Sequence, residues 1–302
     1  MTFPTIPTVA AGRVLLTNQA DTSGTRTFPS LSSLTKNSGD LLIAIITTYQ
    51  STTNPQFTTW GGGFTEFSDQ GSATTMGIGL AYKWSTGSET GTFTVTQAAT
   101  ITGHASMCLM SIPLAHASTI PEAGTIANGT SAAADPASFN PTGWDVEDTL
   151  WIAVDANGET AITGTWLGCG SGTLTNYSGQ ADSAAPDSSI VGQTDLCVSF
   201  RQSAAASEDR GAVSTHDLSN TRNSALIIAV RPAPTPASGS GSFGGTGALT
   251  YNPAVLRVAQ GTAAGVGAFT SVLAKVAADT TTFAGVGSMV ADATFAANAA
   301  AG

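Results

Sequence analysis

Clustered acidic residues are the first features of this chain whose types and spacing could do chemistry. Glu66 and Asp69 lie close together, and Asp145, Glu147 and Asp148 form a second cluster. Two carboxylates at a suitable separation can act as the acid and the base of a glycoside hydrolase. Neither set has the spacing of a calcium-binding loop, and acids in turn-rich sequence are usually solvated charges. We therefore expect no catalytic residue and no metal site among them.

Histidine and cysteine give no stronger signal of catalysis. His216 precedes Asp217, which could orient an imidazole, but serine is so common in this chain that a partner serine carries no information. The three cysteines lack the close spacing of a zinc or dithiol site. Cys108 and Cys197 lie in apolar runs and are expected to be buried small side chains, whereas Cys169, between two glycines, is expected to be exposed.

Aromatic side chains are the better indication of a binding function. A flat aromatic face beside polar groups is a surface on which a sugar ring can stack. Trp60 and Phe64 flank a run of three glycines, and Trp166 lies in turn-like sequence, so we interpret these three as candidate contacts to a glycan or a neighbouring protein. The glycines lack the Lys and the helix of a phosphate-binding loop, and we expect no cofactor. The full aromatic set that could stack on sugars is Trp60, Phe64, Phe67, Tyr82, Trp84, Trp144, Trp151 and Trp166.

Short strands are the elements that must position these residues. Residues 41–48 form a continuous apolar run of strand length, which is typical of a strand covered on both faces. Residues 78–84 and 91–96 flank a Ser/Thr/Gly-rich connector and are expected to form a hairpin. No segment holds a helical period over three turns. Further strands are expected at 105–114, 149–155, 195–202 and 224–230.

Composition supports an all-β class. Hydrophobic residues make up 41% of the 302 residues and charged residues only 10%, with many Gly, Ser, Thr and Ala. We predict an antiparallel β-sandwich of jelly-roll type over residues 1–232. Within it, residues 147–154 resemble residues 39–45, because both place an acid just before an apolar run. We interpret these acids as turn residues that bond the backbone where a strand begins.

A different organisation follows the last expected strand. Residues 233–241, rich in Pro, Gly and Ser, are predicted to be a linker. After them a Gly-x-Gly motif returns every 20 residues, a period too short for one unit to bury its apolar side chains alone. We predict that residues 242–302 form a glycine-repeat β extension that assembles with copies of itself as a homotrimer. The positions that carry this prediction are Gly245, Gly247, Leu249, Gly265, Gly267, Phe269, Phe283, Gly285, Gly287 and Met289.

Charge and hydropathy exclude several partners. The formal net charge is −10 and no run of Lys or Arg occurs, so nucleic acid is not an expected partner. The first residues lack the basic and apolar regions of a secretory signal. No stretch approaches the roughly 18 apolar residues of a membrane-spanning helix.

Several of these motifs together resemble a known group of proteins. Gly39-Asp40-Leu41-Leu42, the segment from Trp60 to Phe64, Ala81-Tyr82-Lys83-Trp84, residues 91–96 and residues 224–232 look like parts of the β-sandwich domain of structural proteins from tailed bacteriophages. The Gly-x-Gly repeats are similar to C-terminal repeats of minor tail proteins from phages of actinobacteria. The resemblance implies a virion component of the minor tail or head-decoration type, assembled in the host cytoplasm with other virion proteins.

Three functions stay open at this point. The first is structural: the extension joins copies, and the sandwich is displayed as a fibre, spike or decoration. The second is adhesive, with the sandwich acting as a lectin-like binder of host-surface glycans. The third, an enzyme that degrades the cell envelope, ranks last because no motif of a known tail-borne hydrolase is present.

Overall fold

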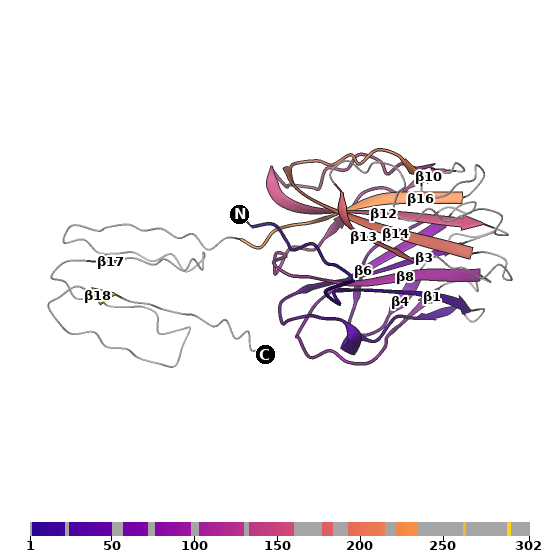
Figure 1. Cartoon of the computed structure of the whole chain (residues 1–302), viewed down its shortest axis with the longest axis horizontal. Helices are drawn as coiled ribbons and strands as arrows, with labels where there is room; N and C mark the ends of the chain where they lie inside the picture. The colour runs from indigo at the N-terminus through magenta and orange to yellow at the C-terminus, as the bar shows by residue number, and fades with distance from the viewer. Residues whose placement is uncertain are drawn as a thin grey trace. The chain divides into compact units, whose positions relative to one another are not determined.

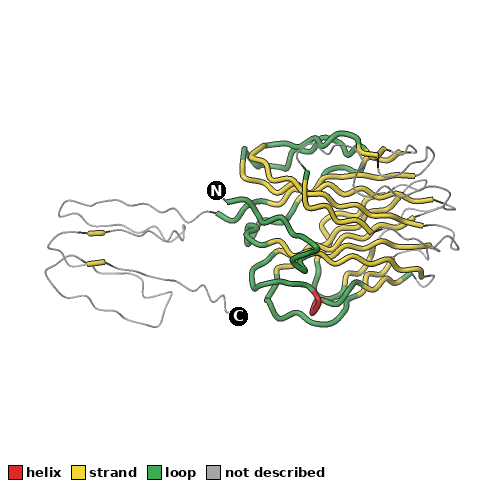
Figure 2. Tube along the Cα trace, viewed as in Figure 1, coloured by secondary structure: helices red, strands yellow, loops and turns green. Residues whose placement is uncertain are grey.

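The computed structural model divides the chain into two units, Met1–Pro234 and Thr235–Gly302. In the first unit the described residues are almost all strand, turn and loop, with one short 3-10 helix, η1 (Leu31–Ser33), as Figure 2 shows. The structure describes residues 2–21, 24–49, 57–71, 76–97, 103–129, 133–159, 177–183, 193–214, 222–234, 262–263 and 289–290.

The first half of the chain builds one antiparallel sheet. In spatial order its strands are β1 (Val14–Asp21), β8 (Gly103–Ile112), β3 (Leu41–Tyr49), β6 (Met76–Trp84) and β5 (Thr65–Gly71). The central strand β3 is buried along its whole length. This explains why its sequence is continuously apolar, since a strand covered on both faces has no side turned to solvent.

The second half builds another antiparallel sheet. In spatial order its strands are β10 (Ala127–Gly129), β16 (Arg222–Val230), β12 (Glu147–Glu159), β14 (Gln193–Ala205) and β13 (Ser178–Ser183). The short strand β9 (Glu122–Ala123) pairs with β16 on the same side as β10. Strands β12 and β14 pair without interruption over their full length.

The two sheets follow the same plan. Counted along the chain within each sheet, with β9 left aside, the strands lie side by side in the order first, fifth, second, fourth and third. The pairing of β5 with β6 is irregular opposite Ala81 and Leu80, and the pairing of β13 with β14 is irregular at the corresponding place, opposite Phe200 and Val198. The matching cross-strand pairs are Ile43–Tyr82, Ile43–Met110, Ile152–Phe200 and Ile152–Ile228.

This correspondence gives the sequence likeness a structural meaning. With Ile43 equivalent to Ile152, the run Leu41-Leu42-Ile43-Ala44-Ile45 of β3 lies at the positions of Leu150-Trp151-Ile152-Ala153-Val154 in β12. Both runs form the second strand of their half and the centre of their sheet. The two halves are therefore two versions of one strand arrangement.

The two sheets pack face to face on a shared core, and Figure 1 shows them as two layers. Side chains alternate along a strand, so every second residue of the central strands points into this core. The core side chains include Ile43, Ile45, Leu80, Cys108 and Met110 from the first sheet and Ile152, Val154, Val198, Phe200 and Ile228 from the second.

The ends of the two closing strands also meet. The N–H of Ala233 donates to the C=O of Leu114 over 2.8 Å, and Ala115 forms a bridge with Pro232. Leu114 and Ala115 are the second and third residues after β8, and Pro232 and Ala233 are the second and third residues after β16. The two segments therefore contact each other in opposite directions. An antiparallel contact between equivalent segments is what a twofold axis produces, so the halves are related by an approximate twofold rotation.

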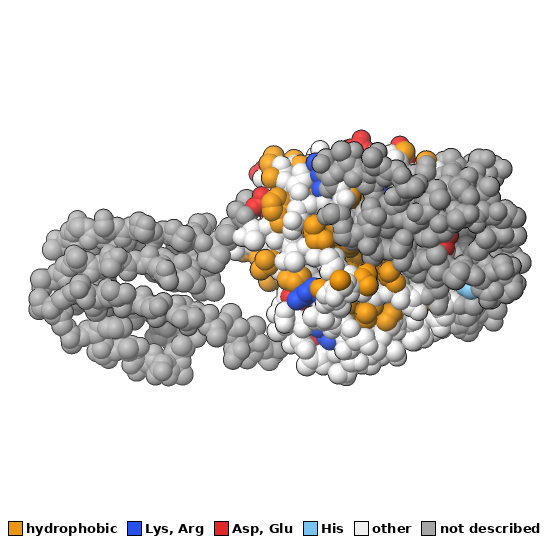
Figure 3. Space-filling model, viewed as in Figure 1, with side chains coloured by type: hydrophobic (Ala, Val, Ile, Leu, Met, Phe, Trp, Pro, Cys, Tyr) orange, Lys and Arg blue, Asp and Glu red, His pale blue; other side chains and the backbone are white. Residues whose placement is uncertain are grey.

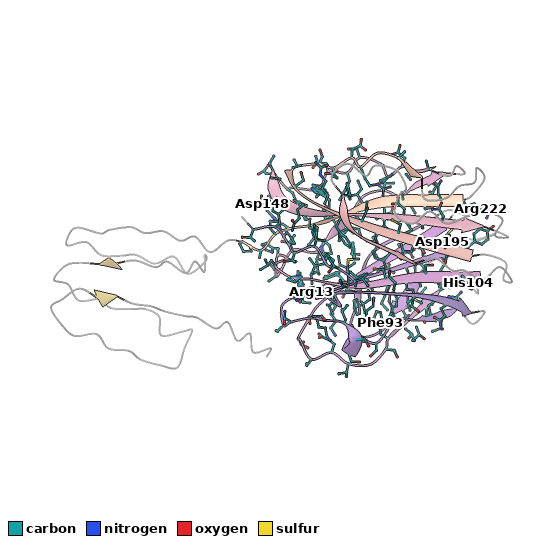
Figure 4. The ribbon with its side chains drawn as sticks, viewed as in Figure 1. Arg13, Phe93, His104, Asp148, Asp195 and Arg222 are labelled. Carbon is teal, nitrogen blue, oxygen red and sulfur yellow. The ribbon has the colours of Figure 1, made fainter. Side chains whose placement is uncertain are left out.

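A third, smaller sheet covers the outer face of the first sheet. Its strands are β2 (Thr25–Thr27), β7 (Thr94–Gln97) and β4 (Phe57–Trp60). Figure 4 shows Phe93 on this side of the molecule, away from the second sheet. The Phe93 ring stacks on Phe28 at 4.6 Å and on Phe64 at 4.4 Å between centroids. The first sheet is therefore buried under apolar side chains on both faces.

The outer face of the second sheet is covered differently. A small apolar cluster consists of Trp144, Trp151, Ile227 and Ala229. Beside it, Asp155 of β12 forms an ion pair with Arg210, and neither side chain has any exposed surface. Charges are rarely buried unless they are paired, so this ion pair belongs to the structure of the layer.

In the second unit the described residues form one short antiparallel pair. Strand β17 (Thr262–Ala263) pairs with β18 (Met289–Val290), and Met289 lies opposite Ala263. β17 precedes the second Gly-x-Gly motif and β18 follows the third. Gly245, Gly247, Leu249, Gly265, Gly267, Phe269, Phe283, Gly285 and Gly287 lie outside the described residues.

These observations confirm the predicted all-β class with antiparallel sheets. The jelly-roll type is not confirmed, because each half of the chain completes a sheet of its own, and neither is the glycine-repeat extension. The predicted hairpin is wrong: β6 pairs with β3 and β5, whereas β7 belongs to the third sheet. Both sides of β6 are occupied by other strands, so the connector carries the chain into another layer.

Candidate functional site

A shallow groove lies where the edges of the two main sheets come together. It has a volume of about 390 Å3 and runs between β5, the edge of the first sheet, and β9, at the edge of the second. Binding sites for small molecules are typically concave, with an apolar wall and a few polar groups. The groove is lined by Thr65, Glu66, Phe67, Tyr82, Ile120, Pro121, Glu122 and Ala123.

One wall of the groove is apolar. Phe67 lies in β5 at the place where the pairing with β6 is irregular, and such an irregularity changes the direction of the side chains that follow it. Its ring meets the ring of Tyr82 edge-on, with 6.0 Å between centroids. Ile120, in the loop before β9, is 49% exposed. An aromatic pair and an aliphatic side chain thus face the opening.

The polar groups of the groove are two carboxylates held by one oxygen each. Glu66 accepts a hydrogen bond on Oε2 from the indole N–H of Trp60 at 2.8 Å. Glu122 accepts one on Oε2 from the backbone N–H of Thr142 at 2.9 Å. Within the described part of the chain, the Oε1 atom of neither residue has a hydrogen-bond partner. Each carboxylate is therefore oriented by the protein and keeps one oxygen to accept a hydrogen bond from a ligand.

A glutamine fixes the two sides of the groove relative to each other. The side-chain amide of Gln70, also in β5, donates to the C=O of Gly124 at 2.9 Å. Its Oε1 accepts the backbone N–H of Ile126 at 2.7 Å. The side chain thus bonds the segment after β9 as a neighbouring strand would. The groove has a defined width because its two edges are tied together beside it.

Asp69 lies on the same strand but does not line the groove. Its Oδ2 accepts the backbone N–H of Phe57 at 2.9 Å. Burial raises the pKa of Asp69 to about 6, an effect that the hydrogen bond from Phe57 opposes and the charge of Glu66 increases. Of the acid pair Glu66 and Asp69, only Glu66 faces the groove, so the two carboxyls are not arranged around one substrate.

The second acid cluster has a structural role at Glu147. Nε of Arg231 donates a hydrogen bond to Oε2 of Glu147 at 2.6 Å, and Nη2 of Arg231 donates to Oε1. The same guanidinium lies over the ring of Trp144, 5.7 Å from its centroid. Glu147 therefore joins the start of β12 to the end of β16 and is not the solvated loop charge that the sequence predicts. Figure 4 places Asp148 at this end of the molecule.

The turn interpretation is confirmed for the acid before β3. Asp40 accepts the backbone N–H of Asn37 on Oδ2 at 2.9 Å, as a turn residue does. The same oxygen accepts a hydrogen bond from Nη1 of Arg13 at 2.7 Å. Asp40 therefore fixes a turn and also links β3 to the start of β1.

The three candidate aromatic contacts predicted from the sequence differ in where they lie and how exposed they are. Trp60 is half-buried and bonds Glu66 of the groove. Phe64 is only 6% exposed and stacks on Phe93, so it belongs to the core and has no face for a ligand. The reason is the turn before it, where Gly62 and Gly63 have φ angles of 65° and 76° and direct the chain back to the core. Trp166 lies outside the described residues.

The other predicted chemical groups do not form a site in the described chain. Cys108 is a free, buried thiol whose pKa is raised by burial. Cys197 is buried as predicted, but it is disulfide-bonded. Cys169, His216 and Asp217 lie outside the described residues. Among the described residues, no group of three or more His, Cys, Asp or Glu side chains could hold a metal ion.

Two further observations concern membranes and surface charge. In the described part of the chain, no helix has the length and apolar character needed to cross a membrane. On the face shown in Figure 3, hydrophobic side chains are interspersed with uncharged polar ones, and charged side chains are few. This agrees with a chain in which only 10% of residues are charged.

Comparison with models of known protein families, with curated protein sequences and with solved structures found no match for this chain.

Proposed function

We propose that this protein is a structural component of a tailed-bacteriophage virion, displayed on the tail or the capsid as an oligomeric fibre, spike or decoration. The virion part of the proposal rests on the resemblance of the sequence motifs, and the oligomeric part is supported by the pairing of β17 with β18 beside successive Gly-x-Gly motifs. A two-stranded pair this short is not stable alone in water. Equivalent strands from other copies, joined as a β extension, would extend this pair.

Truncation tests this proposal. We expect the full chain to be a homotrimer and a chain ending at Pro236 to be a folded monomer, because Met1–Pro234 is a compact unit with its own core. Light scattering on both proteins measures the oligomeric state. If the truncated protein keeps the oligomeric state of the full chain, or if the full chain is itself a monomer, the extension does not join copies.

A second function, adhesion to host-surface glycans, is favoured by the groove. The apolar faces of a sugar ring fit against aromatic side chains such as Tyr82, while its hydroxyls need acceptors such as Glu66 and Glu122. Adsorption of virions to host cells in the presence of the purified protein tests this function. We expect the protein to compete with virions for the cell surface and the Tyr82→Ala variant to compete less well. An envelope-degrading activity has no comparable observation in its favour, and release of sugars from purified envelope would demonstrate one.

A further inference from the structure

Because the two halves of the unit Met1–Pro234 are related by an approximate twofold rotation, the position of the groove has an equivalent at the other pair of sheet edges. There β13 takes the place of β5 and the start of β1 takes the place of β9, and β13 and β1 lie in contact as β5 and β9 do. Phe200 stands at the position of Tyr82, because each lies opposite an equivalent isoleucine. Val14 stands at the position of Ala123, since they pair with the equivalent residues Met110 and Ile228.

The two equivalent positions differ in exposure. Phe200 has no exposed surface, and Val14 is 2% exposed. Tyr82 and Ala123 are both partly exposed, and the groove opens beside them. The same strand arrangement thus buries the residues at one pair of equivalent positions and partly exposes them at the other, so the fold does not itself require an exposed aromatic residue there. A partly exposed aromatic residue beside two oriented carboxylates needs another explanation, and a ligand provides one.

The charge of the groove limits what this ligand can be. Its lining holds two carboxylates and no Lys or Arg. An ionised carboxylate only accepts hydrogen bonds, so it suits hydroxyl or ammonium donors. A carboxylate or phosphate on the ligand would face like charges at close range, which is unfavourable where water is partly excluded.

We propose that the groove binds a hydroxyl-rich saccharide that carries no negative charge. The ring stacks against Tyr82, and its hydroxyls donate to Oε1 of Glu66 and Oε1 of Glu122. Trp60 and Thr142 hold these carboxylates in place before the ligand arrives, which lowers the cost of ordering them. This inference rests on the proposed adhesive function, which it narrows to one class of glycan.

The experiment uses the full chain and a glycan array that contains neutral, amino, uronic-acid and phosphorylated oligosaccharides. The glycans bound are expected to lack uronic acids and phosphates. Calorimetric titration with the best neutral ligand then compares variants. Tyr82→Ala should weaken binding about tenfold, because an aromatic contact of this kind contributes up to about 1.5 kcal/mol. The double variant Glu66→Gln, Glu122→Gln should weaken binding by about tenfold or more, and should also reduce the preference for the neutral glycan over its uronic-acid counterpart.

Two further variants keep the test decisive. Asp135→Asn removes an exposed carboxylate outside the groove and should leave both affinity and selectivity unchanged. Ile120→Asp places a third acid at a half-exposed loop position, so it should fold normally and weaken binding. If wild-type protein binds uronic-acid or phosphorylated glycans as tightly as neutral ones, and binding depends on Tyr82, the inference is wrong while adhesion stands. If no glycan binds, the adhesive function fails as well.

Discussion

The outer faces of the two main sheets hold equivalent positions, and at one of these positions their chemistry is opposite. Ile46 of β3 and Asp155 of β12 correspond, because their cross-strand partners Met107 and Ala225 correspond. Ile46 lies in an apolar layer under the third sheet. Asp155 is equally buried but is paired with Arg210. The shared inner core and strand order therefore define the fold, whereas the outer cover can be apolar or ionic.

The two covers should respond differently to change. In an apolar layer the cost of a substitution rises gradually with the volume lost. In an ionic layer the removal of one partner leaves a charge that is buried without compensation, while the removal of both can be nearly neutral. We therefore expect substitutions in the apolar layer to lower the free energy of unfolding gradually with the volume lost. Substitutions of Asp155 and Arg210 should instead have strongly non-additive effects on it.

The largest effect is expected when the buried ion pair is broken. Arg210→Met should lower the free energy of unfolding by about 3–5 kcal/mol, because it leaves the Asp155 carboxylate buried and unpaired. Adding Asp155→Leu should recover most of the loss. Urea denaturation of the single and double variants measures both values. Equal or additive losses in the double variant would show that the pair is not coupled.

The matched control lies on the apolar side. Ile46→Val, at the position equivalent to Asp155, should cost only about 0.5–1.5 kcal/mol of unfolding free energy. A loss as large as that of Arg210→Met would mean that the two layers do not differ as proposed.

The equivalent positions of Phe200, which is buried, and Tyr82, which is partly exposed, offer a second, smaller test. Phe200→Tyr adds a hydroxyl at a position without exposed surface, where an unsatisfied polar group costs about 1–3 kcal/mol. Tyr82→Phe makes the reverse change at the equivalent, partly exposed position and should stay within about 0.5 kcal/mol of the wild type. Urea denaturation of both variants decides the matter. Similar losses of unfolding free energy at Phe200 and Tyr82 would contradict the difference in exposure between these two positions.

The smallest effect concerns a single carboxyl and its dependence on pH. Because the pKa of Asp69 is raised from 3.8 to about 6, the folded state holds this proton more tightly than the unfolded state does. Stability from this group is therefore lost as the pH rises from about 4 to 6. Asp69→Asn keeps an acceptor for the Phe57 N–H but does not titrate. We compare the melting temperature of Asp69→Asn with that of the wild type at each pH. The difference, variant minus wild type, should be about 1–3 °C larger at pH 7.5 than at pH 4.5, and it is modest because the group is partly solvated.

Scanning calorimetry at pH 4.5 and pH 7.5 measures this difference. Asp135→Asn, which removes an exposed carboxyl elsewhere, serves as the control and should follow the wild type at both values of pH. If the two Asn variants behave alike, Asp69 does not titrate in the folded protein near pH 6.

Much of the strand content could be predicted because it depends on local patterns. The continuous apolar run of β3 reflects burial on both faces, and the similar run in β12 indicates an equivalent strand. The allocation of strands to sheets could not be predicted, since it depends on contacts between distant segments. The segment 91–96, which contains the start of β7, shows the difference: its alternation predicted a strand but could not reveal that its partners are β2 and β4.

The candidate site was harder to predict for the same reason. Glu66 and Glu122 are far apart in the sequence and come together only because the edges of two sheets meet. The sequence predicts a solvated loop charge at Glu147, because its partner, Arg231, lies 84 positions away and cannot be identified from local pattern. Phe64 was assigned to the surface because the glycines before it indicate a turn, but not where the turn directs the chain.

The position of β16 has a mechanical consequence. This strand leads to the end of the body at Pro234, and it lies inside its sheet, paired with β12 on one side and with β9 and β10 on the other. A force on Pro234 directed along the axis of β16 would load the hydrogen bonds to β12 in shear, all at once. An edge strand pulled sideways would instead release its bonds one after another. The first unit is therefore joined to the rest of the chain through a strand that is hydrogen-bonded on both sides.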